Sequence, residues 1–378
     1  MRRWSILKTP SISSTTPPAT GYSWVRASSV WRLRCRCRNA LPRSRLLTFH
    51  LVRLVASRGI AVRVVFFGNS ASSYSNRYYQ GFLEAECQLV AVVDSPSHRR
   101  GATTTAAAAA THQDFVVQAR QRGMPVYDPP TPNQPDLLAA LRALEPDLLV
   151  AVGYMGIFKA DLLAIPRLWA VNFHASLLPA YRGKHPVFWA LRNGERWSGL
   201  TVHVVDAGLD TGDMLYQVRV RTRRNDTPAD LYDRIYERTA DLPARLVRDA
   251  ALGRLRPRPQ PTDGVSYYGS VTEADFRLNW SWPAERLRRM IRVSPGQCFT
   301  SVNGRRLYCL DAELAGGDIT QLPGTLLSVG RTGGGVIQAA DGALRVHRLR
   351  LDNGTSVSLA DACRQLGLSI GAALESVA

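Results

Sequence analysis

Short apolar runs alternate with amphipathic segments along the chain from residue 62 to residue 174. The apolar runs predict buried strands at 62–67, 88–93, 125–127, 147–152 and 169–173. The segments between them predict amphipathic helices at 76–86, 114–122 and 136–144. Strands that alternate with helices favour a mostly parallel sheet with right-handed crossovers. We therefore expect an α/β fold with a Rossmann-like sheet.

Two further strands and a helix extend this pattern. The strands are predicted at 200–205 and 214–220, on either side of a turn rich in Gly and Asp. Thr227 is a typical helix N-cap, and it is followed by Pro228 in the first helical position. One face of the predicted helix carries Leu231, Ile235, Leu242 and Leu246.

The pattern changes beyond residues 254–260, which are rich in Arg and Pro and predict a linker. Five short strands with Gly-rich turns follow at 298–302, 306–312, 324–329, 335–339 and 343–351, and they predict a small, OB-like β-barrel. Helices are expected at 284–291 and 359–366. The predicted parts are a basic extension at 1–61, an α/β domain at 62–253, a linker at 254–264 and a barrel domain with a terminal helix at 265–378.

The positive charge of the chain is concentrated at its beginning. Of the formal net charge of +18, +12 lies in residues 1–60, which hold eleven Arg, one Lys and no acidic residue. Their Ser, Thr and Arg content resembles an organelle transit peptide. A start codon assigned too far upstream and a disordered basic tail are the alternatives.

The rest of the chain is only mildly basic, with a net charge of +6, which suits an anionic ligand or an RNA surface but requires neither. It has no apolar run of the roughly 18 residues that a membrane-spanning helix needs, so we expect no membrane association. The six cysteines are scattered, which favours a reducing compartment. We expect a cytoplasmic protein, or a mitochondrial matrix protein if the extension is a transit peptide, without a metal and as a monomer.

Three polar residues lie where a parallel sheet would form a ligand crevice. Asn172 and His174 are two positions apart at the end of a predicted strand, so their side chains share a face. Asp210 lies in the turn between two later strands and could return to the same crevice. An amide can donate to an oxyanion, an imidazole can move a proton near neutral pH, and a carboxylate can orient the imidazole. Each residue alone is also common in turns and caps, so the prediction depends on the combination.

Two motifs contain these residues. Residues 172–183 read Asn-x-His-x-Ser-Leu-Leu-Pro-x-x-Arg-Gly, and residues 208–215 read Gly-Leu-Asp-Thr-Gly-Asp-Met-Leu. The segment resembles the family of formyltransferases that use 10-formyltetrahydrofolate, and within it the branch that acts on methionyl transfer RNA. The resemblance extends over about 62–378. It implies a formyltransferase catalytic domain and transfer of a formyl group to an amine, most plainly the methionyl amino group of initiator transfer RNA.

The resemblance also implies site residues. Asn172, His174 and Asp210 would be catalytic. The folate co-substrate, 10-formyltetrahydrofolate, would lie against two segments after strands, with residues Gly153, Tyr154, Met155, Gly156, Ile157, Val205, Asp206, Gly208 and Leu209. The acceptor side would comprise Ser176, Leu177, Leu178, Pro179, Arg182 and Gly183, with Arg99 and Arg100 of a basic loop at 94–111 contacting the transfer RNA.

Some positions depart from the transfer-RNA branch. Ala175 replaces a Gly, Lys184-His185-Pro186 replaces Ala-Ala-Pro, and the Trp usual near Pro295-Gly296 is missing. They keep open a second acceptor, a nucleotide-linked amino sugar. Two further alternatives are a hydrolase that passes the formyl group to water and a binding module without catalysis. A dinucleotide oxidoreductase is disfavoured, because the turn at 68–72 lacks the Gly-x-Gly-x-x-Gly spacing.

Overall fold

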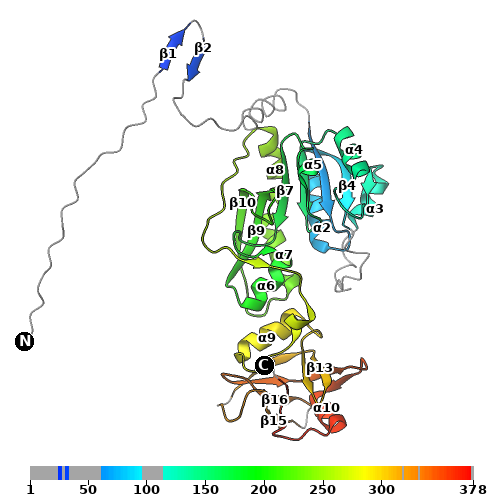
Figure 1. Cartoon of the computed structure of the whole chain (residues 1–378), viewed down its shortest axis with the longest axis vertical. Coiled ribbons are helices and arrows are strands. Elements are labelled where there is room, and N and C mark those ends of the chain that lie inside the picture. The colour runs from blue at the N-terminus through cyan, green and yellow to red at the C-terminus, as the bar shows by residue number, and fades with distance from the viewer. Residues whose placement is uncertain are drawn as a thin grey trace, which may run out of the picture. The chain divides into compact units, whose positions relative to one another are not determined.

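The computed structural model describes most of the chain from residue 61 onward (Figure 1). The described residues are 61–95, 114–316, 319–330 and 333–375, with the backbone of two short strands, β1 (Trp24–Ala27) and β2 (Val30–Leu33). These two strands pair antiparallel in a unit of residues 1–47, and residues 48–378 form a second unit. The rest of the predicted extension and of the basic loop lies outside the described residues.

A seven-stranded sheet forms the centre of the larger unit. Its strand order is β10-β9-β7-β6-β3-β4-β5. The neighbours from β7 to β5 are parallel, whereas β9 is antiparallel to both β7 and β10. This confirms the mostly parallel α/β fold. The strands are β3 (Val62–Gly68), β4 (Cys87–Asp94), β5 (Val126–Tyr127), β6 (Leu148–Val152), β7 (Trp169–His174), β9 (Trp197–Val204) and β10 (Met214–Arg221).

Helices cover both faces of this sheet because successive strand residues point to opposite sides. Val64 and Phe66 pack in a cluster with side chains of α2 (Ser73–Glu84), α3 (Phe115–Gln121), α6 (Pro186–Asn193), α7 (Pro228–Thr239) and α8 (Leu242–Ala251). Val65 and Phe67 pack in a second cluster with side chains of α4 (Pro135–Ala143) and α5 (Ala160–Leu163). The continuous apolar runs are therefore strands buried on both faces.

The single helix predicted after Thr227 is wrong in one respect: it is two helices. Thr227 caps α7 as expected, with its hydroxyl accepting from Asp230 N and its own N–H donating to Asp230 Oδ2. Helix α7 ends at Thr239, and α8 begins at Leu242 with Pro243 in its first turn. A proline has no N–H to continue the preceding helix, and it is accepted in a first turn.

The C-terminal part is an antiparallel β domain with its own core. In the part of this domain that the structure describes, eight strands form two four-stranded sheets, not the five strands expected. One sheet contains β12 (Phe299–Val302), β13 (Arg305–Cys309), β18 (Arg348–Leu351) and β19 (Ser356–Ser358). The other contains β14 (Ala312–Ala315), β17 (Ala343–Val346), β16 (Gly335–Gln338) and β15 (Leu326–Val329). Trp280 and Leu307 are buried in a common core with α9 (Ala284–Val293) and α10 (Leu359–Leu366).

Residues 254–264, the predicted linker, lie against the edge of the central sheet. Arg258 and Met214 exchange two backbone hydrogen bonds, of 2.7 and 2.9 Å. The following strand β11 (Tyr267–Tyr268) pairs in parallel with β8 (Arg182–Gly183), and the short 3-10 helix η2 (Glu273–Phe276) follows it. The segment after the sheet is thereby attached to the Arg-Gly motif.

Among the described residues, no helix combines the length and hydropathy needed to cross a bilayer. Within the same ranges, no three His, Cys, Asp or Glu side chains are grouped so that they could hold a metal ion.

Candidate active site

Strand β7 places Asn172 and His174 on one face of the sheet. The alternate residues, Val171 and Phe173, are buried in the core on the other face. In the antiparallel pairing of β7 with β9, Asn172 lies opposite His203 and His174 lies opposite Thr201. Paired residues point to the same face, so four polar side chains are collected beside the strand end.

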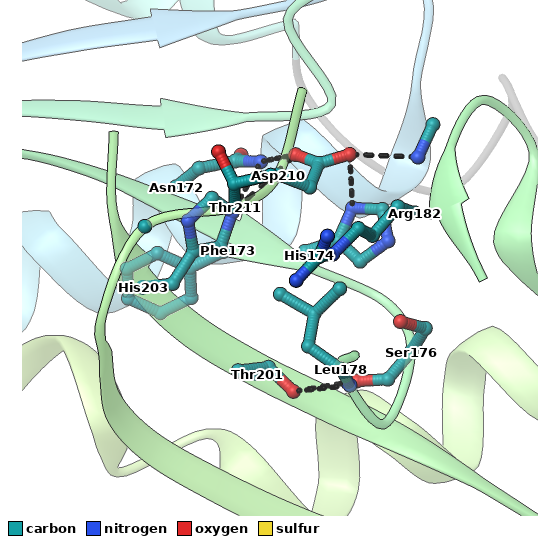
Figure 2. A network of polar contacts seen from close by, with 12 residues as sticks. Asn172, Phe173, His174, Ser176, Leu178, Arg182, Thr201, His203, Asp210 and Thr211 are labelled. Carbon is teal, nitrogen blue, oxygen red and sulfur yellow. Dashed lines mark hydrogen bonds and ion pairs between the residues drawn. The ribbon is translucent and has the colours of Figure 1, made fainter. Parts of the chain in front are cut away.

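Asp210 reaches this face from the turn between β9 and β10. The turn is held by Asp206, whose Oδ1 accepts from Gly208 N at 3.1 Å and from Thr211 Oγ1 at 2.7 Å. Asp210 itself has a φ of 52°, a left-handed conformation that Asp tolerates better than most residues. In this conformation the carboxylate points toward β7 (Figure 2).

The Asp210 carboxylate lies between Asn172 and His174 (Figure 2). Its Oδ1 accepts from Asn172 Nδ2 at 3.3 Å, and its Oδ2 lies 3.7 Å from His174 Nδ1. The structure thus brings the three predicted catalytic residues together, although they are up to 38 positions apart. The His174–Asp210 distance is too long for a hydrogen bond and suits an ion pair that forms when the imidazole is protonated.

The tautomer of His174 follows from its second nitrogen. Nε2 lies 2.8 Å from the carbonyl oxygen of Tyr181, and a carbonyl oxygen only accepts, so Nε2 carries a hydrogen. In the neutral ring, Nδ1 is then unprotonated and faces Asp210. Burial lowers the pKa of His174 below its ordinary value, against the Asp210 carboxylate, which raises it. His174 is therefore a base at neutral pH with Nδ1 as its free site.

Asp210 is held as a carboxylate. Burial raises its pKa, but the imidazoles of His174 and His203, which are positive when protonated, and the hydrogen bond from Gly183 N outweigh this effect. The net result is a pKa well below the usual range. A permanent negative charge beside Nδ1 stabilises the imidazolium form of His174.

His203 is a site residue that the motifs did not single out. Its Nε2 lies 3.3 Å from Asn172 Nδ2 and 3.4 Å from Asp210 Oδ1, and it is 2% exposed. The sequence shows only that His203 and Thr201, two positions apart in a strand, share a face; the pairing of β9 with β7 sets that face beside Asn172 and His174.

The loop from Ser176 to Gly183 is fastened to β9 and to the turn. Ser176 Oγ donates to Ala180 O, and Thr201 Oγ1 donates to Ser176 O, each at 2.8 Å. Leu178 is buried, and its peptide bond to Pro179 is cis. Leu177 is half-buried. These residues and Pro179 belong to the loop that directly follows His174, and the contact of all four with an acceptor stays a prediction.

Arg182 and Gly183 contact the Asp210 turn and the segment after the sheet. Gly183 N donates to Asp210 Oδ2 at 2.8 Å. Arg182 donates to Gln260 Oε1, at 2.7 Å from Nη2, and to the Tyr267 hydroxyl at 2.6 Å. Gln260 in turn donates from Nε2 to Asp210 O and Gly212 O, at 2.7 and 2.8 Å. Gln260 was not predicted, because nothing in its local sequence indicates a partner 50 positions away.

The two predicted folate segments both border the cluster around Phe67. Tyr154 and Val205 are packed on that cluster, and the Tyr154 ring contacts those of Phe67 and Phe158. Apolar side chains of the same segments are solvent-exposed: Met155 by 39%, Ile157 by 73% and Leu209 by 53%. Exposed apolar groups at strand ends are suited to covering a flat ring. Gly153 adopts a φ of 64° there, and Gly156 lies close to the Tyr154 ring and Pro132. Arg99 and Arg100 lie outside the described residues.

Residues 62–245 match the formyl transferase family, and residues 270–367 match the C-terminal domain of formyl transferases. A methionyl-tRNA formyltransferase of Pseudomonas paraeruginosa is 35% identical over 302 residues, which is 79% of this chain and 94% of that protein. One from a Synechococcus strain is 30% identical over 325 residues, covering 83% and 98%.

Two solved structures share the fold at low identity. An N-formyltransferase of Helicobacter canadensis, in complex with folinic acid and dTDP-3-aminofucose, superposes with a TM-score of 0.56 at 17% identity, over 75% of this chain and 98% of its own. The sugar 3N-formyl transferase WlaRD, solved with dTDP and 5-N-formyl-THF, has a TM-score of 0.56 at 16% identity, over 79% and 100%. Identity to the two tRNA enzymes is about twice as high over similar lengths. The chain therefore belongs to the formyl transferase family and, within it, to the methionyl-tRNA formyltransferases.

Proposed function

We propose that this enzyme transfers the formyl group of 10-formyltetrahydrofolate to the methionyl amino group of initiator transfer RNA. The observation that carries the proposal is the orientation of His174. Its Nε2 is fixed on the Tyr181 carbonyl oxygen, and its free Nδ1 faces the Asp210 carboxylate at 3.7 Å. Such a pair can take up one proton without leaving a buried charge unpaired.

The proton in question comes from the acceptor. An amine that attacks a formyl carbon must lose a proton as the new C–N bond forms, and the departing nitrogen must gain one. His174 Nδ1 receives the proton as the base, and Asp210 stabilises the imidazolium that results. The imidazolium then returns the proton to the departing nitrogen, so that atoms and charge balance over the reaction.

Asn172 stabilises the negative charge that develops on the formyl oxygen. Its Nδ2 makes two contacts of 3.3 Å, to Asp210 Oδ1 and His203 Nε2, and the first is longer than an ordinary N–H···O hydrogen bond. One hydrogen of the amide is readily redirected to the formyl oxygen, where charge develops in the transition state. Asp210 and His203 then restrict how the amide can turn.

The folate co-substrate supplies an activated formyl group. The residues that would hold it are the two segments 153–157 and 205–209, whose exposed apolar side chains and strand-end backbone fit a flat heteroaromatic ring with polar edges. Tyr154 and Val205 anchor those segments to the core. Asp206 holds the 205–209 turn, with its side chain bonded to Gly208 N and Thr211.

Transfer RNA is favoured over a nucleotide-linked sugar as the acceptor. The relatives named for methionyl-tRNA are 30–35% identical over about four fifths of the chain, whereas the sugar enzymes, at 16–17%, share only the fold. The two core clusters draw mainly on residues 62–250 and 278–374, although Val293 of α9 packs in the first one, and this division supports a catalytic domain at 62–253, a linker at 254–264 and a C-terminal domain at 265–378.

The test is a formyl-transfer assay with the purified full chain and 10-formyltetrahydrofolate. One arm adds methionyl initiator transfer RNA, the second a dTDP-linked amino sugar, and the third water alone. Formylation of the transfer RNA by the wild type but not by His174→Ala supports the proposal. Formylation of the sugar alone, or release of formate without an acceptor, would overturn it.

A further inference from the structure

A second concave site lies away from the catalytic group, at the contact of the two domains. It is a cavity of about 200 Å³ lined by the end of α6, the end of β10 with the loop that follows, and α9. None of Asn172, His174 and Asp210 lines it. Nothing in the proposed chemistry requires this cavity.

Arginine dominates the lining. Two glutamates, Glu195 and Glu285, and six arginines line the cavity, and the six are Arg196, Arg221, Arg223, Arg224, Arg289 and Arg292. The first four of these arginines are exposed and hydrated, whereas Arg289 and Arg292 are partly buried. Like charges repel, so an excess of cations over anions in one lining favours a negatively charged ligand.

Both carboxylates already have partners, and only one of those partners, Arg224, is an arginine of the lining. Glu285 accepts from Arg288 Nη2 at 2.8 Å and lies 3.6 Å from Arg224 Nη2. Glu195 Oε1 accepts from the Tyr181 hydroxyl at 2.7 Å. Glu285 is thus paired with cations, whereas Glu195 keeps its charge because a tyrosine hydroxyl is neutral.

Arg289 and Arg292 show the resulting imbalance. Arg292 donates from Nε to Asp226 O at 2.9 Å, but its Nη1 has no partner among the described residues, and neither has Nε of Arg289. Burial and then the charge of Arg288 lower the pKa of Arg292. The lowered pKa of Arg292 thus reflects burial first and the neighbouring arginine second.

The position of Arg289 is built into the backbone. Its guanidinium packs directly over Gly194, where a Cβ atom would lie 2.8 Å from Cζ. Gly194 has a φ of 78° and ends α6. The absence of a side chain at this residue lets the guanidinium approach the floor of the cavity.

We propose that this cavity binds a phosphate group. Guanidinium groups match phosphate oxygens with paired N–H donors, and several arginines around one concavity are typical of phosphate recognition. The volume accommodates a phosphate or diphosphate with room for part of an attached group. The phosphate can belong to a small molecule or to an RNA backbone, and the binding step does not depend on the proposed formyl transfer.

The test compares the wild type with variants of the cavity wall. The variants are Arg289→Ala and the double variant Arg196→Gln/Arg221→Gln. Arg292 is retained because its bond to Asp226 O supports the fold. The control is Arg142→Ala, an exposed arginine of α4 outside the cavity. Thermal unfolding of each variant verifies that it is folded.

Three probes are titrated at constant ionic strength set with chloride: inorganic phosphate, pyrophosphate and uncharged transfer RNA. The expected result is binding of phosphate or pyrophosphate by the wild type and Arg142→Ala, weakened at least about tenfold in both cavity variants, as loss of a charge-assisted hydrogen bond predicts. An unchanged transfer-RNA affinity then assigns the site to a small phosphate compound.

The salt dependence of transfer-RNA binding shows whether the bound phosphate belongs to RNA. If the phosphate is part of RNA, the slope of log affinity against log salt for transfer RNA falls by about one for each RNA phosphate that the variant no longer binds. If neither cavity variant changes the affinity for any of the three probes, the proposal is overturned. Formyl transfer is assayed separately in the same variants, so failure of the phosphate site and failure of the proposed function remain distinguishable.

Discussion

The Asp210 carboxylate accepts a 2.8 Å hydrogen bond from the backbone amide of Gly183. Gly183 ends the first motif and Asp210 lies within the second, so this bond joins the two motifs at one atom, Oδ2, which also faces His174. The two motifs together therefore predict one site. The first motif supplies His174, the second supplies the carboxylate of Asp210, and the hydrogen bond from Gly183 N holds that carboxylate beside the imidazole.

Replacement of Gly183 by alanine should disturb this junction. Gly183 has a φ of 101°, and an added Cβ would lie 2.1 Å from the Tyr268 carbonyl oxygen. We expect Gly183→Ala to lower the free energy of unfolding by about 1–3 kcal/mol from the backbone alone, and to reduce kcat/KM as Gly183 N moves from Asp210. Urea unfolding and steady-state kinetics measure the two effects.

Gly123→Ala is the matched control for this change. Gly123 also has a positive φ, of 67°, but no atom of the described residues lies within 4 Å of its added Cβ. The control should therefore show a modest loss of stability and an unchanged kcat/KM. Equal losses of activity in the two variants would contradict the junction.

The pH dependence of kcat/KM should report the base His174. Its pKa lies below the ordinary 6.5 because of burial, so activity should fall only as the pH drops below about that value. Asp210 raises this pKa and His203 lowers it. Asp210→Asn should therefore shift the acid limb to lower pH and reduce the plateau, whereas His203→Gln should shift the limb to higher pH.

The opposite signs make this pair of variants decisive. A general loss of structure would broaden both profiles without displacing them in opposite directions. Shifts of the same sign in Asp210→Asn and His203→Gln would contradict the assignment of the acid limb to His174.

Gln260 should act as a positioning residue for the Asp210 turn. It donates to Asp210 O and Gly212 O and accepts from Arg182. Gln260→Glu keeps the acceptor for Arg182 but sets a carboxylate against two carbonyl oxygens, so we expect a larger fall in kcat than in Gln260→Ala. Each lost hydrogen bond should reduce kcat about five- to tenfold.

A comparison with the exposed Gln121→Ala, outside the site, checks that the loss is specific. The acid limb of the pH profile provides a second measurement, since a shifted Asp210 also moves the pKa of His174. A kcat for Gln260→Ala equal to that of Gln121→Ala would exclude the positioning role.

The sequence predicted those parts of the fold that local pattern determines. Strands β3, β4, β6 and β7 are largely buried on both faces, so their apolar runs were distinctive. Helix α6 was missed because its start, Pro186, follows Lys184 and His185, which suggest a loop. The run at 343–351 was predicted as one strand, yet it divides at His347 into β17 and β18, which belong to different sheets.

The same distinction applies to the site. Asn172, His174 and Asp210 were found because two motifs contain them. Gln260 and Tyr181 were not, since their contributions come from a distant amide and a main-chain carbonyl. Every residue has a carbonyl oxygen, so the residue type of Tyr181 does not indicate its role. The contact of Gln260 with a residue 50 positions away exists only once the chain has folded along the edge of the sheet.

The division into two folding domains can be tested with one truncation in each core. Leu307 is 1% exposed in the C-terminal cluster, and Leu149 is fully buried in the sheet of the α/β domain. Each change to alanine should cost about 2–5 kcal/mol. In hydrogen exchange, Leu307→Ala should reduce protection at 278–374 and leave 62–250 protected, while Leu149→Ala should do the reverse. If either variant reduces protection equally in both regions, the two cores unfold together and the boundary at 254–264 is not a folding boundary.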